Sequence, residues 1–422
     1  MQLDQAWVMQ QGEDAMLLHG VDRAFGTDLP ARIGIAVSGG GDSVALLHLF
    51  VRWSAQTGHP IAAVTVDHGL RSESRAEAEG VAHLCRSLGV PHDILTWQRP
   101  DIAGNLAAAG RNARYDLMAQ WAQQNGIGGI ALGHTIDDTA ENFLIRLGRS
   151  AGLDGLAEMQ ARFVRHGITW VRPLWQQSRE ALRAYLRRHD VPWVEDPSND
   201  DPKYMRTRAR TLLPQLAELG IDAQAIHHSA YALRQAQSAL AHYTRQAAAQ
   251  HVVQQGGDLL LPAQLPTDVP PEIERRLTVA ALQWVGSNPY PPRKIFAGSL
   301  GHELMDQPRT TQSGCLIMKR KDHFHITREY NAVKDLVTAT DVAWDQRWRL
   351  IGPHAPELTI RALGKAVAEV PDWRACGMPR QSLMASPAIW RGDTLIAAPV
   401  AGWGGEWTAQ IFADFTSFLL SH

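Results

Sequence analysis

The fold is decided by Ile33–Val37 (IGIAV), which is followed by Ser38–Ser43 (SGGGDS) and Val44–Trp53 (VALLHLFVRW). A short apolar run that stops at a glycine-rich segment indicates a buried strand. The run after the glycines has the length and the apolar content of a helix. We therefore expect a strand, a glycine loop and a helix in that order, with the loop at the carboxyl end of the strand.

Three more apolar runs, bounded by Gly, Pro or polar residues, predict strands, and longer segments between the runs predict helices. The expected strands are Ile61–Val66, His92–Trp97 and Ile130–Gly133, and the expected helices are Ser43–Ser54, Ser74–Leu88 and Leu106–Gln124. Strands that alternate with crossover helices form a parallel α/β sheet covered on both faces. Ligands on such a sheet bind beyond the carboxyl ends of the strands, so the loops there are the candidates for a site.

The 422 residues exceed what one hydrophobic core usually serves. Beyond the α/β region the pattern indicates a helical stretch over 212–250, two hairpins, a helix over Arg276–Val285 and several short strands. We expect an α/β catalytic domain over 1–215, a helical domain with hairpins over 216–335, and a small β-rich domain over 336–422.

Composition excludes several classes of protein. The cysteines are far apart and form no CxxC pair, which removes support for a disulfide framework, a zinc knuckle or an iron–sulfur cluster. The first residues lack the apolar region of a secretory signal, and no stretch has the ~18 apolar residues of a membrane span. We expect a cytoplasmic protein that has no membrane partner. Its oligomeric state is open, with a homodimer as one candidate.

Charge is uneven along the chain. There are 41 Lys and Arg against 43 Asp and Glu, so a polyanionic partner would have to meet a local basic surface. Residues 161–210 contain eleven Lys and Arg against six Asp and Glu. This excess predicts either a polyanion-binding surface or a solvated helix face around Arg179–Arg188.

The loop after the first strand has the chemistry of an anion site. It consists of two serines, three glycines and one aspartate: Ser38, Gly39, Gly40, Gly41, Asp42 and Ser43. The glycines let the backbone N–H groups approach an anion, and the helix dipole and the hydroxyls assist. A carboxylate beside phosphate is repulsive unless a cation lies between them, so Asp42 suggests Mg²⁺. The pattern is neither a Walker A loop nor a dinucleotide fingerprint, and the alternative is a plain strand-to-helix turn.

This loop resembles the pyrophosphate loop of the PP-loop ATPases, which cleave ATP between the α and β phosphates and adenylate a substrate. The superfamily includes GMP synthetase, NAD synthetase, tRNA thiolases and tRNA(Ile)-lysidine synthetase. The segment VDHGLR is similar to the lysidine-synthetase motif V-D/N-H-x-L-R, which implies that Val66, Asp67 and His68 lie near ATP. Read without the family, the last two predict a capping turn equally well.

Two arginines occur three residues apart in NLAAAGRNARY, on one helical face. Arg111 and Arg114 match the family's R-x-x-R-Y pattern, which implies contacts to the α-phosphate or to the carboxylate of an amino acid. Alone, two exposed arginines would indicate little.

GHTIDDTAEN, residues 133–142, is the most specific segment and resembles the family's GHHxDDQxET. It retains His134, Asp137, Asp138 and Glu141, and it differs at Thr135, Thr139 and Asn142. On a helix that starts near Thr135, the second aspartate and the glutamate share a face. Such carboxylates suit a cationic amine or a metal, and His134 is our candidate base. The alternative is that the aspartates are ordinary N-terminal helix acids.

Later segments match the family in order: LGRSAGLDGL, RPL at 172–174, WVEDPSN at 193–199 and RTRAR at 206–210. Thr207 stands where the family has Asn. The resemblance implies that Arg149, Arg206 and Arg210 contact tRNA.

As a whole, the resemblance implies an enzyme that converts the wobble cytidine of tRNA(Ile) with a CAU anticodon into lysidine, using ATP, Mg²⁺ and free lysine. ATP would adenylate the cytosine carbonyl oxygen, and the lysine amine would then displace AMP. Asp42 would hold the metal. The residues implied in lysine binding are Arg111, Asp138 and Glu141, which with Asp42 and His134 make up the catalytic set.

Two alternatives stay open. A tRNA thiolase of the 2-thiocytidine type has the same loop, but it normally needs paired cysteines. A non-catalytic ATP-dependent RNA-binding module would not require a second acidic cluster beside the loop.

Overall fold

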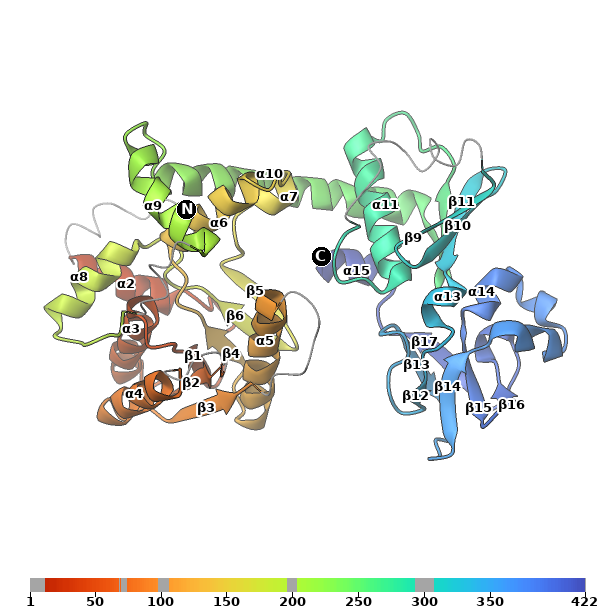
Figure 1. Ribbon diagram of the computed structural model, residues 1–422, viewed down its shortest axis with the longest axis horizontal. Coiled ribbons are helices and arrows are strands. Elements are labelled where there is room, and N and C mark those ends of the chain that lie inside the picture. Colours follow the sequence, from red (N-terminus) through yellow and green to blue (C-terminus); the bar gives the residue numbers. More distant parts are fainter. Residues whose placement is uncertain are drawn as a thin grey trace. The chain divides into compact units, whose positions relative to one another are not determined.

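The computed structural model describes residues 12–67, 69, 74–97, 106–195, 203–292 and 307–421. The chain divides into two compact units, Met1–Gln237 and Ser238–His422. Helix α10 (Ala223–His251) passes from the first unit into the second (Figure 1). The three-domain division expected from the sequence stays a prediction.

A six-stranded sheet forms the centre of the first unit, in the order β3-β2-β1-β4-β6-β5. All neighbouring pairs are parallel except β5 with β6, which confirms the predicted, mainly parallel α/β sheet. The strands are β1 (Ile33–Ala36), β2 (Ile61–Asp67), β3 (His92–Thr96), β4 (Gly129–Ala131), β5 (Arg162–Arg165) and β6 (Ile168–Val171).

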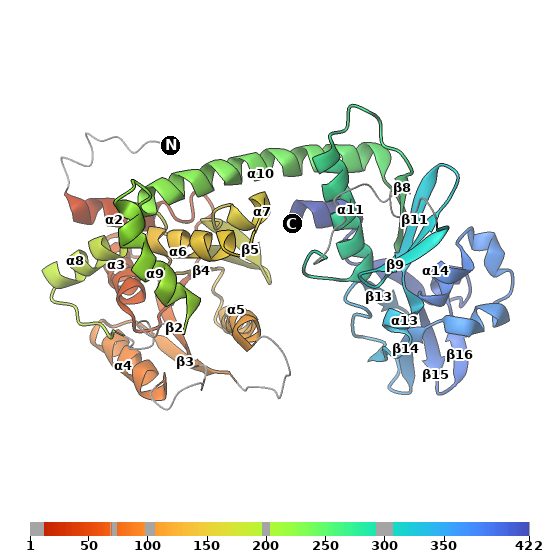
Figure 2. The same cartoon turned by 45° about the horizontal axis from the view of Figure 1, so that its top comes forward.

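Helices cover both faces of this sheet. The helices of this part of the chain are α2 (Glu13–Asp22), α3 (Gly41–Thr57), α4 (Ser74–Ser87), α5 (Leu106–Gln124), α6 (Ile136–Leu147), α7 (Leu153–Leu156), α8 (Arg179–Arg188) and α9 (Met205–Ala217). One core contains residues of α2, α3, α4 and α8, and the other core contains residues of α5 (Figure 2). Successive residues of β2 enter different cores, with Ala62 and Val64 facing α5 and Ile61 and Ala63 facing α3. Burial on both sides explains why these strands are apolar throughout.

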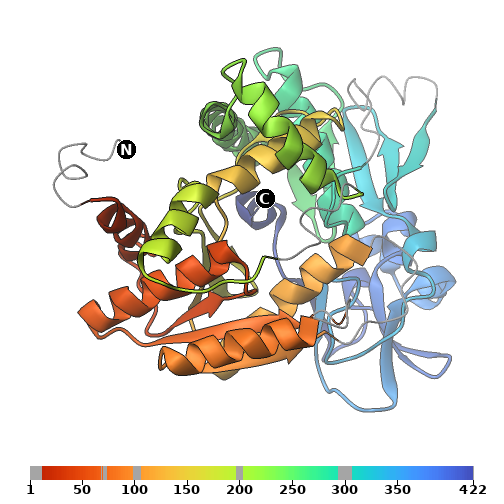
Figure 3. The same cartoon turned by 60° about the vertical axis from the view of Figure 1, so that its left-hand side comes forward.

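Two parts of the first unit differ from the sequence expectation. The basic region 161–210 begins with a hairpin, β5–β6, whose turn residues His166 and Gly167 have φ of 54° and 73°. The helical stretch expected over 212–250 is two helices, because the chain turns at Gly220, with φ 79°, between α9 and α10. The N-terminal end of α8 lies beside α3 (Figure 3).

The second unit is built from antiparallel strands. One sheet has the order β7-β8-β11-β10-β9 and packs on α11 (Pro271–Gly286) and α15 (Phe415–Ser421). Its strands are β7 (Val253–Gln255), β8 (Asp258–Pro262), β9 (Arg309–Gln312), β10 (Cys315–Lys319) and β11 (His323–Arg328). Both hairpins predicted from the sequence are therefore confirmed, as β7–β8 and β10–β11.

The C-terminal strands form a four-stranded sheet and a two-stranded ribbon, in agreement with the β-rich prediction. They are β12 (Thr338–Ala339), β13 (Trp348–Ile351), β14 (Leu358–Ala362), β15 (Pro387–Arg391), β16 (Thr394–Ala397) and β17 (Thr408–Ile411). Short helical turns connect them: α13 (Tyr330–Val333), η2 (Gly364–Glu369), η3 (Trp373–Cys376), α14 (Arg380–Met384) and η4 (Pro399–Ala401).

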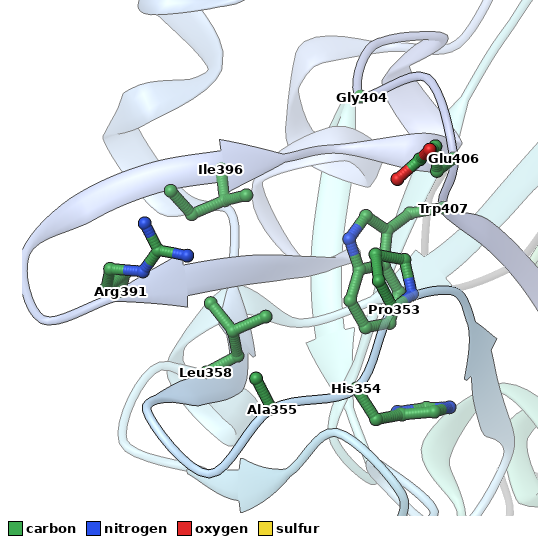
Figure 4. A pocket seen from close by; sticks show the side chains of 9 residues that line it. All are labelled: Pro353, His354, Ala355, Leu358, Arg391, Ile396, Gly404, Glu406 and Trp407. Carbon is green, nitrogen blue, oxygen red and sulfur yellow. The ribbon is translucent and has the colours of Figure 1, made fainter.

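A hollow of about 430 Å³ lies between these strands and is lined by His354, Arg391, Glu406 and Trp407 among others (Figure 4). The imidazole of His354 stands edge-on to the indole of Trp407, with 5.3 Å between the ring centres. Within the described ranges, no helix is both long and apolar enough to span a bilayer.

Candidate active site

The sheet order places three loops at one edge. β1 lies between β2 and β4, so the segments after these strands meet at the carboxyl end of β1. From β1 the chain adds β2 and β3 on one side of that strand and then crosses to the other side to form β4. This reversal is the position at which open α/β sheets bind ligands. The three motifs singled out from the sequence follow these three strands.

The glycine loop is closed by hydrogen bonds within itself. The Ser38 N–H donates to Ser43 Oγ at 3.0 Å, and the Ser43 hydroxyl donates to Gly40 O at 2.9 Å. Gly39 has φ 91°, a conformation that favours glycine. Helix α3 begins at Gly41, directly after this turn. The loop therefore has the strand–turn–helix geometry in which backbone N–H groups point at an anion.

Neighbouring segments clamp the loop from two sides. The Val194 N–H donates to Gly39 O at 3.1 Å, and a Cβ on Gly41 would lie 3.3 Å from the indole of Trp193. From β4, a Cβ on Gly133 would lie 3.1 Å from Asp42 O. A side chain at either glycine would be tightly packed, and its neighbour would have to move by a few tenths of an ångström, so glycine favours this close approach.

An acidic cluster lies beside the loop and surrounds one guanidinium. Arg179 Nε donates to Asp42 Oδ2 at 3.2 Å, and Arg179 Nη1 donates to Glu141 Oε1 at 3.0 Å. Arg179 Nη2 lies 3.7 Å from Asp138 Oδ1. The side chains are largely buried, with exposed fractions of 15% for Arg179 and 0% for Glu141. The structure thus brings together Asp42, Asp138 and Glu141, which the sequence placed in one site.

Each of two carboxylates in the cluster has one oxygen left over. Among the described residues, Asp42 Oδ1 and Glu141 Oε2 are buried and have no hydrogen-bond partner. Burial raises the pKa of Asp42 although the Arg179 guanidinium opposes the shift. An unpaired buried carboxylate oxygen is costly, so these two atoms indicate places for a bound cation or donor.

Asp42 Oδ1 fits a magnesium ion that accompanies ATP. Mg²⁺ is usually held by one or two carboxylates together with substrate phosphates, so a complete protein cage is not needed. The described residues contain no group of three or more metal-ligating side chains, in keeping with that mode. The remaining ligands would come from the nucleotide and from water.

Asp138 has a structural partner besides Arg179. It is the third residue of α6, and its Oδ2 accepts hydrogen bonds from the N–H and the hydroxyl of Thr135 at 2.9 and 3.2 Å. This is the helix-capping arrangement that the sequence left open as an alternative. Asp137 Oδ2 likewise accepts the backbone N–H of Arg179 at 2.7 Å. The predicted lysine-binding role of Asp138 stays a prediction.

His134 is held by an arginine that the sequence had not assigned. Arg172 Nε donates to His134 Nδ1 at 3.1 Å. Burial lowers the pKa of His134, and the Arg172 charge lowers it further. Because Nδ1 accepts, the neutral ring carries its proton on Nε2 and is a donor there. The predicted role of His134 as base stays a prediction.

On the other side of the loop, Asp67 closes a turn at the end of β2. Its Oδ1 accepts the Gly69 N–H at 2.9 Å and the Ser74 hydroxyl at 2.7 Å. Val66 lies half-buried on the same strand. His68, predicted beside ATP, lies outside the described residues. The capping turn is present, and nucleotide contact by this strand end stays a prediction.

The predicted arginines separate into two groups. Arg111, Arg114, Arg149 and Arg206 are exposed. Arg210 instead turns into the cluster, where its Nε donates to Glu141 Oε1 at 2.9 Å. Arg149 follows α6, whose 12 residues span about 18 Å, so it is remote from Thr135 at the other end. No contact to RNA tests these assignments.

Sequence reasoning missed Arg179 as an individual residue because it was seen only as part of a basic helix. A signal was present, since Arg179 is the first residue of α8, immediately after the N-cap Ser178. A cation there opposes the helix dipole and needs a compensating anion. Otherwise α8 has the buried and the exposed face expected of a surface helix, and its buried residues are Leu182, Tyr185 and Leu186.

Comparison with known proteins agrees with this geometry. Residues 17–216 match the PP-loop domain family. The tRNA(Ile)-lysidine synthase of Ruegeria pomeroyi is 43% identical over 96% of this chain and 98% of its own. That of Wolbachia pipientis wMel is 33% identical over 89% and 90%. Among solved structures, the U34-tRNA thiolase NcsA from Methanococcus maripaludis covers 53% of this chain and 80% of its own, at 14% identity and a TM-score of 0.46.

Proposed function

The chain belongs to the tRNA(Ile)-lysidine synthase family, and we propose that it joins free lysine to C2 of the wobble cytidine of tRNA(Ile) with a CAU anticodon. It is an ATP-using ligase that modifies tRNA. The observation that carries the proposed mechanism is a pair of buried oxygens beside the glycine loop, Asp42 Oδ1 and Glu141 Oε2, which have no partner among the described residues. We assign the first to the metal of a nucleotide and the second to an amine.

The first step activates the base. The cytosine carbonyl oxygen is a poor leaving group, so it attacks the α-phosphorus of ATP, and the bond from that phosphorus to pyrophosphate breaks. The N–H groups of the loop and of the first turn of α3 bind the departing pyrophosphate. Asp42 Oδ1 would hold Mg²⁺, which supplies charge neutralisation when it is bound. His134 Nε2–H is available as a donor to an oxygen in this region.

The second step forms the carbon–nitrogen bond. The lysine ε-amine attacks C2 of the activated ring, and AMP leaves with the oxygen. The amine has an ordinary pKa of about 10.4, so it must lose a proton first. Glu141 Oε2 is the free acceptor that this cluster offers to the ammonium, because its Oε1 is already bound by Arg179 and Arg210. We place Asp138 and Arg111 at the same substrate, as the sequence indicated.

Exposed arginines supply the proposed RNA contacts. Arg149 and Arg206 are free of the acidic cluster's hydrogen bonds and are exposed, which suits contacts to phosphates of the anticodon arm. Arg210 is hydrogen-bonded to Glu141, and we propose that it lies between the bound RNA and the lysine amine. The target base has to leave its stack, at a cost of a few kcal/mol. We place the reaction in the cytoplasm, and the homodimer stays a prediction.

Two of the three described thiols, Cys85 and Cys315, give little support to the thiolase alternative. Burial raises the pKa of Cys85 to about 11 and that of Cys315 to about 12. A sulfur carrier needs a thiolate, which forms when the pKa is lowered and the thiol is accessible. Cys85 lies in the core beside α3, away from solvent.

The deciding experiment measures two activities of the full chain with a tRNA(Ile) transcript that carries CAU. We expect tRNA-dependent ATP–pyrophosphate exchange and incorporation of labelled lysine into the RNA. A transcript with uridine at the wobble position is the control and should accept no lysine. Exchange without lysine incorporation would contradict the proposal, and absence of both activities would favour the non-catalytic alternative.

A further inference from the structure

Arg179 contacts carboxylates that the proposed function assigns to different steps. Its Nε is bound to Asp42, which serves adenylation, and its Nη1 is bound to Glu141, which serves lysine attack. We propose that Arg179 is a positioning residue that holds these two carboxylates in register and so couples the two half-reactions. This inference rests on the proposed function and adds a residue that the motifs did not assign.

The hydrogen bonds of Arg179 occupy only one oxygen of each carboxylate. Arg179 engages Oδ2 of Asp42 and Oε1 of Glu141, and the second oxygen of each carboxylate is buried and has no partner in the part of the chain that the structure describes. Both carboxylates are therefore oriented by the same planar group, with one oxygen held and the other presented. A side chain that served only as a counter-ion would not need to divide the oxygens in this way.

The backbone of Arg179 is itself fixed. Its N–H donates to Asp137 Oδ2 at 2.7 Å, and the N–H of Ile136 donates to Gln177 O at 3.0 Å. These bonds join the first turns of α6 and α8. Ser178 caps α8 by accepting the Ala181 N–H at 3.1 Å. The guanidinium thus extends from an anchored helix end toward the loop at the start of α3.

The bridge requires the shape of arginine. A guanidinium presents donors in a rigid plane and can hold two carboxylates at fixed directions, whereas a lysine ammonium is a point charge on a flexible stem. Misplacing a reacting group by about 1 Å can cost about 100-fold in rate. Arg179→Lys retains the charge and removes the fixed geometry, so it separates positioning from simple charge neutralisation.

The test compares Arg179→Lys with a matched control, Arg276→Lys, in the full chain. The side chain of Arg276 is 14% exposed and pairs with Glu272 in the first turns of α11, in the other unit. Four quantities are measured: the melting temperature, the tRNA-dependent ATP–pyrophosphate exchange rate, and the maximal rate constant and half-saturating lysine concentration of single turnovers on adenylated tRNA. Direct lysine binding is followed by calorimetry with tRNA and a non-hydrolysable ATP analogue.

We expect Arg179→Lys to fold and to lose about 100-fold in exchange, with a lysine Kd raised about tenfold or more. Arg276→Lys should stay within about twofold of the wild type in both. A loss confined to one half-reaction would overturn the coupling, and so would wild-type behaviour of Arg179→Lys. A drop in melting temperature with unchanged exchange and lysine binding per folded molecule would show a structural role only. Failure of the wild-type chain to incorporate lysine would overturn the proposed function itself, and this inference with it.

Discussion

Each unit contains a cluster in which a buried arginine binds carboxylates. The two arginines are about equally buried, but the clusters differ in how many carboxylate oxygens have a hydrogen-bond partner. In the second unit Arg328 donates to both oxygens of Asp345, at 2.9 and 2.8 Å, and to Gly314 O at 2.9 Å. In the first unit Arg179 binds one oxygen of Asp42 and one of Glu141, and the other two oxygens have no hydrogen-bond partner within the described ranges. The arginine side chains are 14% and 15% exposed, respectively. A satisfied pair stabilises the fold, whereas a cluster with unpaired oxygens is prepared for a ligand.

The largest expected effect is on the satisfied pair. Arg328→Met would leave Asp345 buried without its partner and should lower the free energy of unfolding by about 3–5 kcal/mol. Urea unfolding followed by tryptophan fluorescence measures this loss. The double variant Arg328→Met/Asp345→Asn should recover part of it, because the Asp345 charge that lost its partner is removed as well. If Arg328→Met unfolds like the wild type, the structural interpretation of this pair is wrong.

The next effect is on the open cluster. Asp42→Asn should reduce ATP–pyrophosphate exchange by about 10²–10³-fold, because the carboxylate that we propose to hold the metal beside the pyrophosphate is lost. Burial raises the pKa of Asp42, which means that its charged form is disfavoured in the folded chain at neutral pH. The melting temperature should therefore stay equal or rise. Exchange at the wild-type rate would remove Asp42 from the mechanism.

A smaller effect is expected from Glu141, which we propose to bind the lysine amine. Glu141→Gln should raise the lysine KM about tenfold, since the amide accepts a hydrogen bond but no longer attracts the ammonium by charge. Glu158→Gln is the control, because Glu158 is similarly buried and pairs with His227 at 2.6 Å outside the site. Steady-state kinetics with varied lysine distinguish the two. An equal rise of KM in both variants would indicate a general loss of packing.

The smallest effect is expected at Asp14, whose ion-pair cluster is partly exposed to solvent, unlike the two buried arginine clusters. Hydrogen bonds from Arg188, His189 and Arg52 outweigh burial and lower the pKa of Asp14 to about 2. Because the folded pKa is below the ordinary 3.9, this stabilisation is complete above about pH 4 and disappears as the pH falls through 2. Asp14→Asn should cost under about 1 kcal/mol at pH 7, since the cluster is solvent-screened. A gap between wild type and variant that widens at acid pH would contradict this sign.

Much of the first unit could be predicted because its signals are local. The strands at Ile33, Ile61, His92 and Ile130 follow from apolar runs between breakers, and the glycine loop follows from residues adjacent in the chain. The edge hairpin β5–β6 was not predicted, because its sequence is strongly basic and only one of its strands is largely buried.

The sequence by itself determined the order of strand, glycine loop and helix, and it identified the carboxylates Asp42, Asp138 and Glu141, because those signals depend on neighbouring residues. Only the tertiary structure decided which atoms of these carboxylates are free. Arg179 is 137 residues from Asp42 in the chain, and the contact exists because α8 packs on α3 while the β1–β4 pairing brings α6 alongside. Long-range packing of this kind leaves no periodic or local pattern in the sequence, and the hydrogen bond from Arg172 to His134, 38 residues away, is a second example.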